Sequence, residues 1–179
     1  MEELIEKMNV LLATSFALYL KTHNFHWNVR GPLFSQYHEF FGDLYEVFYN
    51  AIDPTAEEIR ALGAPAPGGL GVYKEKSLIT DTAGELDVPQ MVTALYYDNN
   101  TVIQILNEAH ILATTAKQYG LLNFLEAQLD EHKKYAWQLS VSMGPSVSAT
   151  TVTPVKEETE SAAATITEEV KTYVLNPKQ

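Results

Sequence analysis

The stretch that decides the fold and the candidate chemistry is Thr22-His23-Asn24-Phe25-His26-Trp27-Asn28-Val29-Arg30-Gly31-Pro32. Its first part continues a run of apolar residues spaced three and four apart, which is the spacing of one face of an amphipathic helix. The Gly31-Pro32 dipeptide ends that helix. A second periodic run follows directly. The sequence therefore predicts two antiparallel helices joined by a tight turn, with His26 before the turn and His38 after it.

Outward from this turn, the same periodicity predicts four long helices. They cover residues 4–29, 34–62, 88–119 and 121–143. Short turns separate the first two helices and, at Gly120, the last two. Residues 64–87 form a long connection, with a loop over 64–71 and a short helix at about 73–79. Short, long and short connections predict an all-α four-helix bundle with a long crossover connection that carries a short helix.

The chain divides into a bundle domain and a tail of different composition. Gly144-Pro145 closes the bundle, so we expect a domain over residues 1–144. Residues 145–179 are rich in Ser, Thr and Glu, with one moderately helical patch from 166 to 174. The role of this C-terminal tail does not follow from its composition.

Composition excludes several classes of protein. The 179 residues include no cysteine, so disulfide frameworks and thiolate metal sites are excluded, and any metal must be held by nitrogen and oxygen ligands. A formal net charge of −11 repels nucleic acid. The apolar runs are too short to span a membrane, and the N-terminus lacks the basic region of a secretory signal. We therefore expect a cytoplasmic protein that binds neither membranes nor DNA.

Two pairs of candidate metal ligands are separated along the second helix. His26 and His38 flank the turn and can reach one site, whereas Asp53 and Glu57 are four residues apart on one helical face. At 1.5 Å per residue, His38 and Asp53 lie roughly 22 Å apart along the helix. If all four residues bind one metal, a second copy of the chain must complete the site about a twofold axis.

These residues carry a family resemblance. The stretch from Thr22 to Pro32, followed at family spacing by Phe34, His38, Glu39, Asp53, Ala56, Glu57 and Leu62-Gly63, resembles the Dps mini-ferritins of the ferritin-like superfamily. The resemblance covers residues 1 to about 144. It implies a hollow dodecamer with a ferroxidase centre at each dimer interface. Such a shell oxidises Fe(II), with hydrogen peroxide or oxygen as the oxidant, and stores ferric iron, which protects against oxidative damage.

The resemblance also implies roles for individual residues. His26 and His38 match the iron ligands of one subunit, and Asp53 and Glu57 match those of the other. The iron site between subunits is a two-iron or mixed-occupancy site, and Trp27 packs beside it. Further acidic residues match metal-binding positions inside the shell (Glu39, Asp43) or at threefold pores (Glu126, Asp130). The remaining histidines match no metal position (His23, His110, His132).

The chain departs from the family pattern at two positions. An acidic residue usually stands four positions after the second histidine, where this chain has Gly42 followed by Asp43. Pro54 directly follows Asp53, so this segment also fits a helix start with Asp53 as N-cap and Pro54 at the first position. A proline here predicts a kink in the second helix at the site itself.

Two alternatives to a ferroxidase follow from these departures and from the family. One is a structural shell of the same fold whose ferroxidase centre is impaired by Gly42 and Pro54. The other is a DNA-binding Dps, in which a basic terminal extension holds the phosphates. The tail offers three lysines, Lys156, Lys171 and Lys178, against five glutamates, so phosphate attraction is weak.

Overall fold

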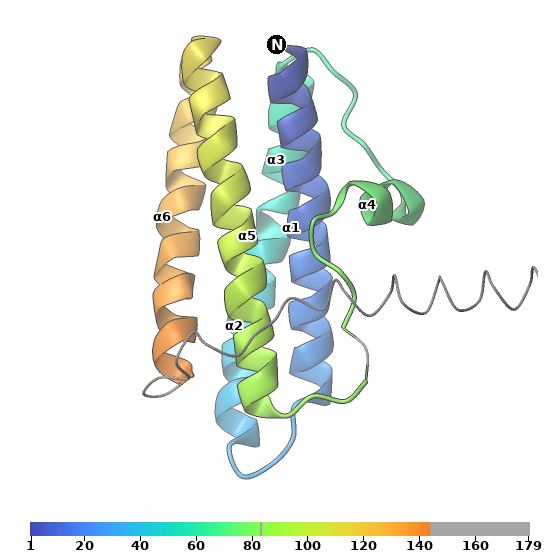
Figure 1. Ribbon diagram of the computed structural model, residues 1–179, viewed down its shortest axis with the longest axis vertical. Helices are drawn as coiled ribbons and strands as arrows, with labels where there is room; N and C mark the ends of the chain where they lie inside the picture. The colour runs from blue at the N-terminus through green and yellow to red at the C-terminus, as the bar shows by residue number, and fades with distance from the viewer. Residues whose placement is uncertain (83, 144–179) are drawn as a thin grey trace, which may run out of the picture. The chain divides into compact units, whose positions relative to one another are not determined.

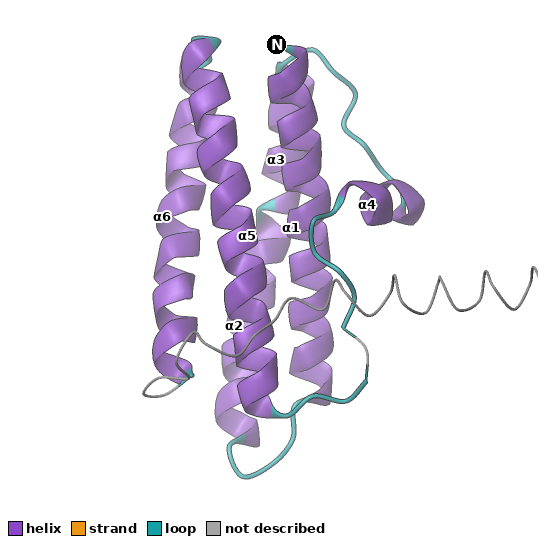
Figure 2. Cartoon of the chain, viewed as in Figure 1, coloured by secondary structure: helices purple, strands orange, loops and turns teal. Residues whose placement is uncertain are grey.

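The structure is a computed structural model that describes residues 1–82 and 84–143. Within those residues every regular element is a helix (Figure 2). The helices are α1 (Glu2–Asn28), α2 (Phe34–Asn50), α3 (Ile52–Ala61), α4 (Leu70–Lys76), α5 (Val88–Thr115) and α6 (Tyr119–Ser142). The expectations for the tail and its helical patch lie outside the described residues.

The described helices form a four-helix bundle in which α2 and α3 together make one of the four rods (Figure 1). α1 runs away from the end marked N, and α2 and α3 return beside it. The crossover, which carries α4 along α1, then brings the chain back to the end where α2 began, so α5 points the same way as α2. α6 packs antiparallel on α5. The prediction of an all-α bundle with a helical crossover is confirmed.

Apolar stripes from the four rods meet in one core. Its largest fully buried side chains are Leu4, Met8, Leu11, Leu12, Leu18, Phe41, Leu44, Ile59, Leu95, Ile105, Leu106 and Leu125. Each such side chain stabilises the fold by about 1.5–3 kcal/mol relative to exposure. The stripes cover only one face of each rod. Accordingly, no helix in the described part of the chain has the length and hydropathy of a membrane span.

Pro54 splits the second rod. Proline has no N–H to donate to the carbonyl four residues earlier, and its ring collides with that carbonyl. The residue four positions before Pro54 is Asn50, where α2 ends. Ala51 separates the two helices and caps α3, with the Thr55 N–H donating to its carbonyl at 3.2 Å. The predicted kink is confirmed, whereas the alternative N-cap role of Asp53 is wrong, because Asp53 lies inside the first turn of α3.

Two other boundaries differ from the predicted ones. The short crossover helix begins at Leu70, inside the segment expected to be a loop. The chain reverses between α5 and α6 at 116–118 rather than at Gly120, which is the second residue of α6. Lys117 takes the left-handed conformation, with φ 57°, and its N–H donates to the Thr114 carbonyl at 3.1 Å. A non-glycine residue in this conformation gives little signal in a sequence.

A polar pair is buried where α5 meets α6. The Nδ2 of Asn99 donates to the His132 carbonyl at 2.8 Å, so its Oδ1 accepts from His132 Nδ1 at 2.6 Å. The His132 ring stacks on Phe48, with centroids 5.4 Å apart. Because this site excludes water, burial lowers the pKa of His132 from 6.5 to about 4.

The depressed pKa of His132 predicts a pH-dependent stability. Between pH 6.5 and 4, His132 binds a proton in the unfolded chain but stays neutral in the folded chain. The free energy of unfolding therefore falls as the pH falls through this range. We expect this residue to contribute a loss of about 3 kcal/mol across that window. Urea unfolding of wild type and His132→Gln at several pH values measures it. The variant is less stable near neutrality, and its deficit shrinks toward pH 4. A deficit independent of pH contradicts the prediction.

Candidate metal centre

The turn between α1 and α2 places two histidines at one end of the bundle. α1 ends at Asn28, and Gly31 reverses the chain with φ 113°, a conformation that glycine adopts without strain. The Phe34 N–H donates to the Gly31 carbonyl at 3.0 Å and closes the turn. His26 lies in the last turn of α1, and His38 lies one turn into α2. The two sides of this hairpin therefore face each other at the histidines.

Each histidine ring is hydrogen-bonded to the backbone of the other histidine. His26 Nδ1 donates to the His38 carbonyl at 2.7 Å, and His38 Nδ1 donates to the His26 carbonyl at 2.9 Å. The rings are stacked, with centroids 3.8 Å apart and planes 23° apart. Because α1 ends at Asn28, the His26 carbonyl is one of the terminal carbonyls that a helix leaves without an internal N–H partner. The His38 ring supplies that partner.

This exchange determines which nitrogen of each ring can bind a metal. A carbonyl oxygen only accepts hydrogen bonds, so each Nδ1 must carry the proton. In the neutral ring, Nε2 then holds a lone pair. An imidazole whose other nitrogen donates to a carbonyl is the usual arrangement of a metal-binding histidine, because the bond fixes the tautomer and the ring orientation. The pair therefore offers two oriented Nε2 ligands.

Aromatic side chains surround the histidine pair. Phe34 stacks on His38, with centroids 4.9 Å apart, and Tyr45 packs edge-on against His26 at 5.2 Å. Tyr45 was not among the predicted site residues, although it lies seven positions after His38 and so on the same face of α2. Trp27 contacts His23, at 4.1 Å, and so borders the centre through that ring. Partial burial, with a smaller contribution from His26, lowers the pKa of His23.

Gly42 lies directly against the His26 ring. A Cβ built on it meets His26 Nδ1 at 3.4 Å and Cε1 at 3.5 Å, which are ordinary van der Waals distances. The backbone therefore has room for a side chain at the position where the family usually has an acidic residue. The chain therefore lacks this carboxylate although a Cβ has room at position 42.

The predicted carboxylate ligands do not join the histidines within one chain. Asp53 and Glu57 are exposed on α3, four residues apart on one face. Neither has a hydrogen-bond or ion-pair partner among the described side chains. No cluster of three or more His, Asp or Glu side chains that could hold a metal occurs within residues 1–82 and 84–143. The structure thus brings together His26 and His38, and keeps the acidic pair apart on another helix.

The other predicted acidic residues lie elsewhere on the bundle. Glu39 and Asp43 are exposed on α2. Asp43 lies near α6, because its charge, together with that of Glu131, adds to the effect of burial in raising the pKa of Tyr135. It therefore does not replace a side chain at position 42.

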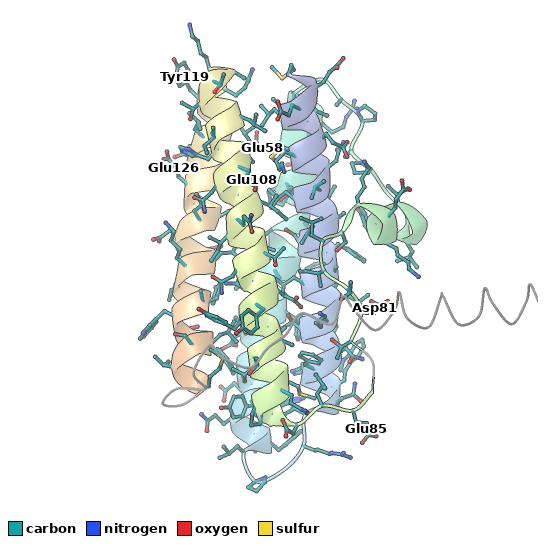
Figure 3. All side chains as sticks on the ribbon, in the orientation of Figure 1. Glu58, Asp81, Glu85, Glu108, Tyr119 and Glu126 are labelled. Carbon is teal, nitrogen blue, oxygen red and sulfur yellow. The ribbon has the colours of Figure 1, made fainter. Side chains whose placement is uncertain are left out.

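The two candidate pore residues lie on α6. Glu126 accepts from His110 Nε2 at 3.1 Å, bridging α6 and α5 (Figure 3). Asp130 is exposed one turn further along the helix.

Comparisons with known proteins agree with this architecture. A family model described as a ferritin-like domain matches residues 5–143. DNA protection during starvation protein 2 of Bacillus anthracis is 32% identical over 138 residues, which cover 77% of this chain and 94% of that protein. Dps from Staphylococcus aureus superposes with a TM-score of 0.78 at 27% identity, covering 82% of this chain and 98% of that one.

A more distant structure has the same fold. Dps from Vibrio cholerae O1, described as a member of a broad superfamily of ferritin-like diiron-carboxylate proteins, superposes with a TM-score of 0.77 at 23% identity, covering 79% of this chain and 89% of that one. The bundle with its crossover and histidine hairpin is that of a ferritin-like protein. Within this class, the chain belongs to the Dps family of mini-ferritins.

The crossed hydrogen bonds predict the tautomers of the two histidines. In metal-free protein, we expect the neutral form of each ring to carry its proton on Nδ1 and a lone pair on Nε2, because Nδ1 donates to a carbonyl. Nitrogen NMR of histidine-labelled protein distinguishes the two nitrogens. A bare Nδ1 in either ring contradicts the geometry described here.

Proposed function

We propose that this protein oxidises Fe(II) at centres shared between two copies of the chain and stores the ferric product inside a dodecameric shell. The observation that carries the proposal is the His26–His38 pair, whose crossed hydrogen bonds leave two oriented Nε2 lone pairs at one place. Imidazole nitrogen combined with carboxylate oxygen suits iron that must bind and react with an oxidant. The chain supplies both ligand types, on different helices.

Sharing between copies follows from where these ligands lie. His38 and Asp53 are separated by about 20 Å of helix, far beyond the span of a metal site. Both carboxylates of the acidic pair are exposed and unpaired within the described chain. A twofold axis that lays two such subunits antiparallel brings the histidines of each copy to the acidic pair of the other, and it generates two equivalent centres.

An apolar groove beside α1 supports contact with a second copy. The groove has a volume of about 620 Å³ and is lined by α1 and by the crossover with α4. Large apolar side chains on its rim are exposed: Leu20 is 43%, Trp27 59% and Leu70 73% exposed. A contiguous apolar surface of this kind typically marks an interface. Because Trp27 lines this groove, a second copy bound there would lie beside the histidine hairpin.

The proposed reaction consumes iron as substrate. Two Fe(II) ions give one electron each to hydrogen peroxide, and with two protons the products are two Fe(III) ions and two waters; oxygen is the other candidate oxidant. The imidazoles hold the cation without adding charge, and the carboxylates of the second copy balance the charge that oxidation adds. Gly42 leaves one carboxylate fewer than the family pattern provides. We therefore propose a site that fills with one or two irons according to the supply.

Removal of both imidazoles tests the enzyme itself. We expect the double variant His26→Ala, His38→Ala to oxidise Fe(II) no faster than buffer, because only carboxylates remain at each centre. Stopped-flow absorbance of the ferric product after mixing with hydrogen peroxide measures the rate, and size exclusion verifies assembly. A wild type no faster than buffer, with the double variant equal to it, would identify a structural shell with an impaired centre. A double variant as fast as an active wild type would show that His26 and His38 are not the iron ligands.

Mixed assemblies test the sharing of the centre between copies. We expect the double variant above and a second variant, Asp53→Ala and Glu57→Ala, each to be inactive alone. When they are unfolded together and reassembled, half of the dimers are mixed, and one of the two centres in each has all four ligands. We expect about a quarter of wild-type activity to return. If each centre were built within one chain, no activity would return.

Gly42 offers a gain-of-function variant. We expect Gly42→Asp to tighten Co(II) or Fe(II) binding several-fold, because the added Cβ fits beside His26 next to Cε1, the ring carbon bonded to Nε2, and a carboxylate there is within reach of a metal bound to that nitrogen. Gly42→Asn is the matched control, since it has the same shape without the charge. Calorimetric titration of the metal measures both variants. Equal affinities for the Asp and Asn variants would show that position 42 does not face the metal.

A further inference from the structure

An ion pair borders the apolar groove beside α1. Lys21 lines this groove, and its Nζ donates to Asp98 Oδ2 on α5 at 2.5 Å. The side chains of Lys21 and Asp98 are only 11% and 18% exposed. In another ion pair between α1 and α5, the side chains of Lys7 and Glu108 are 27% and 43% exposed. The groove therefore has a pair of charges beside its apolar walls that is already largely withdrawn from water.

Asp98 neutralises a cation at a surface that otherwise suits an apolar partner. The other charged side chains that line the groove, Lys74 and Asp81, are exposed on the crossover and can turn toward water. Lys21 is held in place by its bond to Asp98. Covering an unpaired cation costs far more free energy than covering an ion pair. A second copy can thus cover the groove at low cost only while Asp98 is ionised.

Asp98 is the member of the pair that titrates in acid, because lysine stays charged below about pH 10. Burial raises the pKa of Asp98, and the hydrogen bond and charge of Lys21 oppose this effect. Within the described part of the chain, no other charged group lies close enough to shift this pKa. On the α6 side of α5, His132 binds the neighbouring Asn99 and stays neutral above its pKa of about 4. A single chain therefore accepts a proton on Asp98 at a higher pH than an ordinary aspartate does.

We propose that the Lys21–Asp98 pair makes the contact between two copies of the chain acid-sensitive, so that this contact opens when Asp98 takes up a proton. The inference rests on the proposed function, in which a second copy covers the groove. The proton binds the Asp98 carboxylate and breaks the ion pair, which leaves Lys21 as a covered cation without a counter-charge. In a separated chain, water in the groove hydrates the freed ammonium instead. The separated chain thus binds the proton more readily than the pair of chains, and association weakens as the pH falls.

Sedimentation velocity of the full-length wild type over a pH series tests the acid sensitivity. The series runs at constant ionic strength from neutral pH down to just above the pKa of His132, which is about 4. We expect the assembled species to be lost toward acid and to return on neutralisation. Protonation of Asp98 should weaken association by about a hundredfold or more. An assembly that persists unchanged over the series while circular dichroism shows folded chains overturns the proposal.

Substitutions at the pair separate its charge from its packing. Asp98→Asn keeps the shape of the side chain without the charge, so we expect it to associate as weakly at neutral pH as wild type does in acid. Lys21→Met combined with Asp98→Leu removes both charges, and we expect this double variant to assemble at neutral pH and in acid alike. Glu108→Gln is the matched control, because it breaks an ion pair between the same helices nearer the other end of the bundle from the histidine hairpin (Figure 3). We expect it to keep the pH dependence of wild type.

The outcomes separate this inference from the proposed function. A folded Asp98→Asn that assembles like wild type at neutral pH overturns the acid-sensitive contact, and so does a double variant that dissociates in acid as wild type does. If Asp98→Asn does not fold, the double variant decides alone. A Glu108→Gln variant that dissociates at neutral pH also overturns the role of this particular pair. In each of these cases the proposed function stands, whereas a wild type that is monomeric at neutral pH overturns the shared centre itself.

Discussion

Two hydrogen bonds that cross between α1 and α2 hold the histidine pair in place, and the proposed chemistry depends on them. Each bond joins a ring of one helix to the backbone of the other, so neither imidazole can rotate without losing a partner in the opposite helix. The bonds also satisfy a carbonyl left free by the end of α1. The helix terminus, the tautomers and the direction of both Nε2 atoms therefore have one common cause, which is the turn at Gly31.

Much of the fold followed from the sequence because periodicity and turn residues are local signals. The apolar stripes located the four rods, Gly31-Pro32 located the first turn, and Pro54 located the break in the second rod. The reversal at Lys117 could not be predicted in the same way, because nothing in the sequence marks a lysine that adopts the left-handed conformation, here with φ 57°. The alternative N-cap role of Asp53 is wrong because the collision of Pro54 with the Asn50 carbonyl ends α2 at Asn50, and α3 already begins at Ile52, before Asp53.

The candidate site could be predicted only in part, because side-chain orientation is not encoded in spacing. Spacing alone brought His26 and His38 to one place. It did not predict that each ring donates to the carbonyl of the other histidine, since this depends on the side-chain rotamers and on how closely α1 and α2 approach. Tyr45 was not predicted for a similar reason: the helical repeat puts it on the same face of α2 as His38 but does not show that its ring packs against His26.

Because the second rod is broken at Ala51, His38 on α2 and the carboxylates Asp53 and Glu57 on α3 lie on two helices that can be oriented independently. In a continuous helix, the angular position of Asp53 and Glu57 would be tied to that of His38 by the helical repeat. Here α3 is oriented instead by its own packing against α1, through buried residues such as Ile59. An insertion or deletion in α2 could thus be absorbed at this joint without changing the orientation of Asp53 and Glu57. The proline gives the chain a tolerance to changes of length that an unbroken rod would lack.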